Sequence, residues 1–297
     1  MYPSEFYGLF PPFPVEKQIF VAMSFSDEFQ FRWEKVILPA ISRISKDGVE
    51  LKAHRVDVKK VSGSILTEIL TGISQSLLVL ADISTIGKID DSAIRNANVL
   101  YEVGLAQAVR LPEEVLLFRS DRDPLLFDVS NIRVNFYDPD NEVEQSQKKL
   151  IEAMEAAFGE IDQKKQLTVQ RFAKTLDYPS WWTLALAAFQ NGLSHPVQKS
   201  IGQILGSFSQ SQAINRLLEI GALTSKFQKL TTEILEKNID NDRGELLMQY
   251  DITPLGTAIL KHTGEEMGLM EPAISNYFEK KIKEGGHLPF TPNKPES

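Results

Sequence analysis

Short apolar runs alternate with longer amphipathic segments between residues 19 and 161, and few folds are compatible with this alternation. The runs have the length of buried strands, and the segments between them repeat apolar residues at helical spacing. Strands that alternate with helices are typical of a parallel sheet with helices on both faces. The pattern therefore predicts an α/β domain with strands at 19–23, 49–57, 77–82 and 114–118.

Helices are expected in the segments that separate and follow these strands, at 29–45, 62–76, 96–109 and 141–161. Pro39 lies within the first of these helices. Because proline has no backbone N–H to donate, we expect it to disturb the helix there. We expect the last helix to close the domain.

The strand signals fade after about residue 165, and the rest of the chain is mainly helical in pattern. Residues 196–226 divide into a helix, a short turn and a second helix that stops at Gly221. We expect Ser209 to cap the second helix. Its buried stripe should consist of Ile214, Leu217 and Leu218.

A strand that runs into a helix is expected at 246–262. Thr253 is a good N-cap, and Pro254 suits the first helical position. With 297 residues, two domains are the natural expectation. We divide the chain into an N-terminal lead (1–18), an α/β domain (19–162), a mainly helical domain (163–285) and a flexible tail (286–297).

The composition excludes several kinds of site. There is no cysteine, which rules out disulfides, thiolate zinc sites and cysteine nucleophiles. The four histidines are scattered and show no metal-ligand spacing, so we expect neither a metal nor a cofactor. The first residues carry no basic stretch, and no apolar run approaches the ~20 residues of a membrane helix. We expect a soluble cytoplasmic protein without a membrane partner.

Charge is distributed unevenly between the two halves. Residues 1–164 contain 18 basic and 26 acidic residues, whereas residues 165–297 contain 14 of each. This asymmetry fits two modules with different roles. It argues against a nucleic-acid interface, which needs a clustered basic face.

Small and polar residues follow each strand of the predicted sheet. In an open parallel sheet, ligands bind beyond the carboxyl ends of the strands, near helix N-termini. Gly63, between Ser62 and Ser64 at a helix start, suits close approach of a phosphate or a ribose. The dinucleotide glycine pattern, the P-loop lysine motif and the nucleophile elbow are absent from the sequence.

Two carboxylates are expected at this edge, Asp82 directly after a strand and Glu102 in the first turn of helix 96–109. Taken singly, an Asp there commonly caps a helix and a Glu complements the helix dipole. Together with Asn96 and Asn98 they favour a functional interpretation. A carboxylate at a helix N-terminus should stay ionised and could attack or stabilise an anomeric centre.

The segments "FVAMSFSDEF", "SGSILTEILTGISQSLLVLADIS", "NANVLYEVGLAQAV" and "FDVSNIRVNFYDPD" resemble, in this order, the nucleoside deoxyribosyltransferase-like and TIR-like nucleotide-binding family. The resemblance implies a flavodoxin-like domain that binds a nucleoside or nucleotide and often cleaves its N-glycosidic bond. It implies that Glu102 is the catalytic carboxylate and that Asp82 lines the pocket, and we expect both to take part in catalysis. It places Ser24, Phe25, Asp57 and Asn98 in the substrate pocket, and we add Gly63, Ser64 and Asn96 as binding residues because they lie at helix starts on the same edge. The segment 85–95 is longer than the corresponding loop of that family.

The second half, around "SFSQSQAINRLLEIGALTSK" and "YDITPLGTAIL", is similar to winged-helix DNA-binding domains. The residues of its candidate recognition helix that can read base edges are Gln210, Gln212, Asn215 and Arg216. Because this half is neutral and Arg216 has no basic neighbours, we favour protein docking over DNA binding here.

Three functions follow; the charge balance disfavours one of them, a regulator that binds DNA, and the other two remain open on the sequence. The first is an N-glycosidase or deoxyribosyl transferase acting on a nucleoside, nucleotide or NAD; by resemblance, such a protein would be an effector of prokaryotic defence with a docked partner. The second is a nucleotide sensor without turnover, coupled to a winged-helix domain that contacts DNA or protein. The identity of base and sugar, the need for an activator and the formation of a homo-oligomer are left open.

Overall fold

The computed structural model describes residues 9–11, 15–56, 65–90, 92–125, 133–189, 192–196, 208–227 and 247–266. The chain divides into two compact units, unit 1 at residues 1–165 and unit 2 at residues 166–297. The division falls inside a single helix, α6 (Val143–Thr175), which is 33 residues long. The helix expected at 141–161 therefore continues well past its predicted end.

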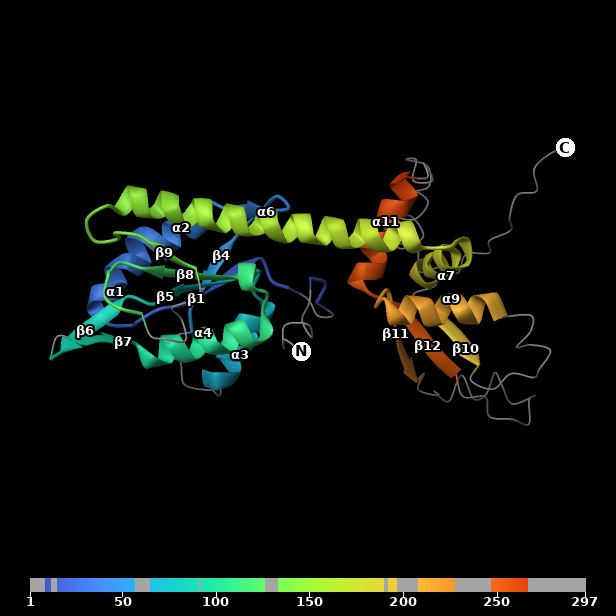
Figure 1. Ribbon diagram of the computed structural model, residues 1–297, viewed down its shortest axis with the longest axis horizontal. Helices are drawn as coiled ribbons and strands as arrows, with labels where there is room; N and C mark the ends of the chain where they lie inside the picture. Colours follow the sequence, from blue (N-terminus) through green and yellow to red (C-terminus); the bar gives the residue numbers. More distant parts are fainter. Residues whose placement is uncertain are drawn as a thin grey trace. The chain divides into compact units, whose positions relative to one another are not determined.

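Unit 1 contains a five-stranded sheet in which every pairing is parallel, in the order β4-β1-β5-β8-β9 (Figure 1). The chain runs from β1 outward to β4 and then returns past β1 to β5. The direction of winding thus reverses between β1 and β5, which is the flavodoxin-like order. The strands are β1 (Gln18–Ala22), β4 (Lys52–His54), β5 (Leu78–Asp82), β8 (Val115–Arg119) and β9 (Val134–Phe136).

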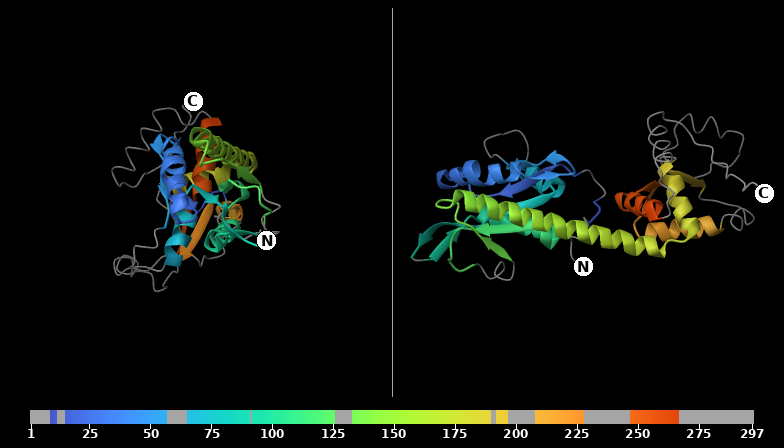
Figure 2. Two further views of the ribbon diagram at one scale, coloured as in Figure 1. Left: turned by 90° about the vertical axis from the view of Figure 1, so that its left-hand side faces the viewer. Right: turned by 90° about the horizontal axis from the view of Figure 1, so that it is seen from above.

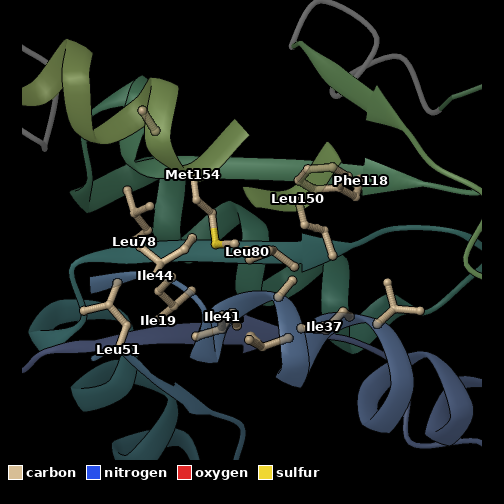
Figure 3. Close-up of a cluster of buried hydrophobic side chains, with 14 of the residues drawn as sticks. Ile19, Ile37, Ile41, Ile44, Leu51, Leu78, Leu80, Phe118, Leu150 and Met154 are labelled. Carbon is tan, nitrogen blue, oxygen red and sulfur yellow. The ribbon is translucent and has the colours of Figure 1, made fainter. Parts of the chain in front are cut away.

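Helices cover both faces of this sheet, as the alternating pattern predicts (Figures 1 and 2). Successive residues of β5 point to opposite faces, so Leu78 and Leu80 enter one core while Val79 and Ala81 enter the other. The first core packs against α1 (Asp27–Arg32), η2 (Trp33–Ile37), α2 (Leu38–Ser42) and α6 (Figure 3). The second packs against α3 (Ile65–Gln75) and α4 (Ala97–Val109).

Pro39 disturbs the first helix as expected, and the structure compensates for it. The helix begins at Asp27, passes through one π-helical segment and ends at Ser42. Pro39 cannot donate a hydrogen bond to the carbonyl of Lys35, one turn earlier. Gln147 of α6 donates to that carbonyl instead, at 2.6 Å from Nε2 to O.

The strand expected at 49–57 is divided. Its first residues form β3 (Val49–Glu50), which pairs with β2 (Ser45–Lys46) in a small hairpin. Asp47 and Gly48 both have positive φ, as a two-residue hairpin turn of this twist requires. Lys52–His54 form β4 in the main sheet. A 3-10 turn, η3 (Pro112–Glu114), leads into β8.

A second hairpin occupies the long segment at 85–95. It consists of β6 (Thr85–Ile89) and β7 (Ser92–Arg95), which pair antiparallel between β5 and α4 (Figure 1). The sequence of this segment predicts only a longer connection. The hairpin closes on itself, so its two ends come back together at the sheet.

Unit 2 has a three-stranded antiparallel sheet in the order β10-β12-β11, with helices α7, α9 and α11. The described elements follow one another as α7-β10-α9-β11-β12-α11, with more strand than predicted because β10 and β11 were not expected. The residues between β10 and α9 and those between β11 and β12 lie outside the described part. The bounds are α7 (Tyr178–Phe189), β10 (Leu193–Pro196), α9 (Phe208–Glu219), β11 (Leu223–Phe227), β12 (Leu247–Ile252) and α11 (Pro254–Glu266).

Two predicted helix boundaries in unit 2 have different outcomes. Thr253 accepts a hydrogen bond from Gly256 N at 3.1 Å and Pro254 is the first residue of α11, so that helix start is confirmed. Ser209 is not a cap, because α9 already begins at Phe208. The buried stripe of α9 consists of Ala213, Ile214 and Leu217, with Leu218 only half-buried.

Candidate functional site

The carboxyl ends of the parallel strands bring several loops to one edge of unit 1. Ser24–Ser26 follow β1, Ile83–Ser84 follow β5, and Ser120–Asp123 follow β8. Winding reverses between β1 and β5, and ligands of such sheets bind in the crevice at that point. This edge is therefore the candidate site.

Glu102 is the sixth residue of α4 and lies in its second turn, not in the first turn as expected. Its side chain is half-buried and makes no hydrogen bond or ion pair with any residue that the structure describes. Burial raises the pKa of this carboxyl from 4.5 to about 7. Burial thus opposes the ionisation that a place at the helix N-terminus was expected to favour.

The side of α4 that carries Glu102 is polar and accessible. Asn98 precedes Glu102 by one helical turn and is exposed, and Tyr101 is 56% exposed. Asn96 is the N-cap: its side-chain oxygen accepts from Asn98 N at 3.0 Å and from Val99 N at 3.4 Å. Asn96 therefore shapes the helix start, while Asn98, Tyr101 and Glu102 present an amide, a phenol and a carboxyl.

Asp82 does not lie open at the site. Its side chain is fully buried and accepts hydrogen bonds from Ser84 N at 3.0 Å, from the Ser84 hydroxyl and from the Tyr137 hydroxyl at 2.6 Å. Arg32 adds an ion pair at 3.5 Å. These partners fill the four acceptor positions of a carboxylate. The geometry gives Asp82 a structural role instead of the contact with substrate that the sequence predicts.

Asp82 and Glu102 are associated with opposite faces of the sheet. Asp82 alternates in phase with Leu78 and Leu80, which enter the core beneath α1, η2, α2 and α6. Glu102 belongs to α4, whose buried residues pack against the other face. The two side chains that were expected to act together therefore start from elements that pack on different faces, and the acceptors of Asp82 are taken up by the buried network.

Arg32 and Tyr137 complete the buried network and were missed by sequence reasoning. Arg32 also pairs with Asp140 at 2.6 Å and lies over the Phe29 ring. Burial raises the pKa of Tyr137 well above its ordinary value, and the neighbouring Asp82 adds to the effect. The sequence offered one signal for Arg32: it is a basic residue on the apolar face of the helix expected at 29–45.

The loop after β1 contributes one buried and one exposed residue. Ser24 is buried, with its hydroxyl 3.2 Å from that of Ser26. Phe25 is 45% exposed, and the Arg55 guanidinium lies 4.5 Å from its ring centroid. Arg55 lies at the same distance from the Trp33 ring. The predicted binding residues Asp57, Gly63 and Ser64 lie outside the described residues.

The polar residues of α9 differ in availability. Gln212 and Asn215 are exposed, and Gln210 is half-buried. Arg216 donates to Asp177 at 2.9 Å and to the carbonyl of Thr175. A cation already paired in this way is less suited to a phosphate or base contact than the sequence predicts.

The described ranges contain no group of three or more His, Asp, Glu or Cys residues that could hold a metal ion. The helices in those ranges are all too short or too polar to span a membrane.

Comparison with known proteins adds little to this geometry. Neither a protein-family model nor a curated protein matches the chain. One similar solved structure is the metal-soaked flavodiiron core of Flv1 from Synechocystis sp. PCC6803, at 13% identity and a TM-score of 0.33. The match covers 48% of this chain and 36% of that one, so the chain spans about a third of its length.

Proposed function

We propose that unit 1 is an N-glycosidase or deoxyribosyl transferase that cleaves the N-glycosidic bond of a nucleoside, a nucleotide or NAD. The observation that carries the proposal is Glu102, a half-buried carboxyl with a pKa of about 7 at the carboxyl edge of a doubly wound sheet. A strongly perturbed pKa at such an edge is characteristic of functional carboxyls. The sequence resemblance independently assigns the reaction to the same residue.

In the proposed reaction the Glu102 carboxylate attacks the anomeric carbon, or stabilises the positive charge on it, while the bond to the base breaks. The bonding electron pair leaves with the base, which then takes up a proton from water. A base that is cationic in the substrate, as nicotinamide is in NAD, leaves neutral without a proton. Water or an acceptor base then takes the sugar and releases the carboxylate.

Neighbouring groups have supporting roles in this proposal. Asn98 and Tyr101 are the polar groups on the same side of α4 and suit sugar hydroxyls. Phe25 offers an exposed ring against which a base can stack. Asp82 positions the loop after β5 through Ser84 and does not contact substrate.

A nucleotide sensor is the second candidate function. The burial of Asp82 favours it, because the site then lacks the second carboxylate that was expected beside Glu102. Unit 2 would report the bound ligand to a partner. The pairing of Arg216 with Asp177 and the exposed Glu219 on α9 support a protein partner over DNA. A role as a defence effector requires the same kind of partner.

The deciding experiment measures base release from a panel of nucleosides, nucleotides and NAD by chromatography. Wild type is compared with Glu102→Gln and with Glu155→Gln, a matched change at an exposed position of α6. Release by wild type and Glu155→Gln but not by Glu102→Gln supports the enzyme. Binding of one ligand by all three proteins, without release of base, supports the sensor and rejects the enzyme.

A further inference from the structure

A buried arginine, Arg95, lies two residues before the first residue of α4. Arg95 is the last residue of β7 and directly precedes the N-cap Asn96. Its side chain is only 3% exposed. A guanidinium at this depth must be paired and hydrogen-bonded, because an isolated buried charge is costly.

The partners of Arg95 come from two different strand ends. Its two terminal nitrogens lie 2.9 and 3.2 Å from the two carboxylate oxygens of Asp121, in a bidentate pair. It also donates to the carbonyl of Ile83, directly after β5, and to that of Asp123 at 3.3 Å. One side chain thus connects the start of α4 to the loops that follow β5 and β8.

Asp121 holds the other end of the inserted hairpin as well. Its carboxylate accepts from the backbone N–H of Thr85, the first residue of β6, at 2.8 Å. It also accepts from Asp123 N at 3.0 Å. Burial disfavours ionisation of Asp121, but the hydrogen bonds from Arg95 and Thr85 lower its pKa overall. The ion pair is therefore formed at neutral pH.

We propose that Arg95, acting through Asp121, is the positioning residue that fixes the start of α4 and with it the Glu102 carboxyl. Along the chain, the hairpin at 85–95 lies between β5 and α4, so α4 does not follow directly from the end of β5. Because both hairpin ends bind one carboxylate, the insertion leaves the helix in a defined place. This inference rests on the proposed function of Glu102, since positioning matters for catalysis only if Glu102 reacts.

The test compares Arg95→Met and Arg95→Lys with Lys88→Met. Lys88 forms an ion pair with Asp123 at 2.9 Å on the same hairpin but does not touch the start of α4, so its loss is the matched control. Misplacing a reacting group by about 1 Å can cost about 100-fold in rate. We expect kcat to fall about 100-fold in Arg95→Met and about 10-fold in Arg95→Lys, with KM within about threefold. Lys88→Met should retain wild-type kcat.

A second readout separates positioning from mere stability and needs no turnover. Carboxyl-carbon NMR titration of Glu102 should give a pKa near 7 in wild type and Lys88→Met, and a lower value, toward 4.5, in Arg95→Met. If Arg95→Met does not fold, Arg95→Lys is titrated in its place. A folded variant with unchanged kcat and unchanged Glu102 pKa overturns the proposal. If wild type releases no base, the proposed function fails, while the titration still decides whether Arg95 places Glu102.

Discussion

Replacing Glu102 by glutamine should stabilise unit 1 at pH 8 and leave its stability unchanged near pH 4.5. Burial raises the pKa of the carboxyl in the folded protein from 4.5 to about 7. The unfolded chain therefore releases this proton at lower pH than the folded chain does. The stability that Glu102 contributes in its protonated form is lost as the pH rises from about 4.5 to about 7. Above pH 7 the ionised carboxyl destabilises the folded protein by a constant amount. Glutamine carries no charge at any of these values.

The size of the effect follows from the same pKa. One pKa unit corresponds to about 1.4 kcal/mol, so the full difference between 4.5 and about 7 amounts to about 3.4 kcal/mol. Because the side chain is only half-buried, solvent screens its charge, and we expect about 1–2 kcal/mol. For a domain of this size that raises Tm by about 3–6 °C.

Scanning calorimetry at pH 4.5 and pH 8 measures this difference. Glu155→Gln serves as the control, because Glu155 is exposed on α6 and its replacement should change Tm equally little at both pH values. The reasoning is refuted if Glu102→Gln shifts Tm by the same amount at both pH values, or if it lowers Tm at pH 8. A gain in stability on loss of a reactive carboxyl would fit the usual conflict between stability and activity at functional sites.

Three further outcomes are expected. If the ionised Glu102 attacks the sugar, kcat/KM for base release should rise with pH through about 7 and level off above, and a flat profile between pH 5 and 9 would contradict this. Asp82→Asn should destabilise unit 1 by about 1–3 kcal/mol in urea unfolding, because an amide nitrogen replaces one of the buried oxygens that accept from Ser84 and Tyr137, while Arg32 keeps its ion pair with Asp140; an unchanged midpoint would contradict the buried network. Gly256→Ala should destabilise unit 2 by about 1–3 kcal/mol in the same assay, since the added methyl overlaps the Ala222 carbonyl oxygen, and an unchanged midpoint would count against that contact.

The parallel sheet was predictable because its central strands are continuous apolar runs. β5 is buried along its whole length, and β1 nearly so, and such runs leave a clear signal in the sequence. β9 was missed because it has three residues at the edge of the sheet, none of them buried. The hairpin at 85–95 was missed because its strands are mostly exposed and show no clean alternation of apolar and polar residues.

The candidate site was predictable only in part. The resemblance identified Glu102, but its raised pKa depends on burial by neighbours that a sequence does not reveal. The role of Asp82 was misjudged for a related reason. Its partners Arg32 and Tyr137 lie 50 and 55 residues away along the chain, and each looked unremarkable in its own segment. Long-range polar pairing of this kind leaves no local pattern.

The hydrogen bond from Gln147 to Lys35 has a consequence for the order in which unit 1 can fold. The first helix of the chain carries a carbonyl that Pro39 leaves without its helical donor, and the group that satisfies it lies 112 residues later. Leu150 and Met154 of α6 likewise complete the core on the face that this first helix covers. During synthesis the first helix therefore cannot complete its packing until α6 has been made. A chain that ends before residue 143 should expose an incomplete core to proteases and chaperones.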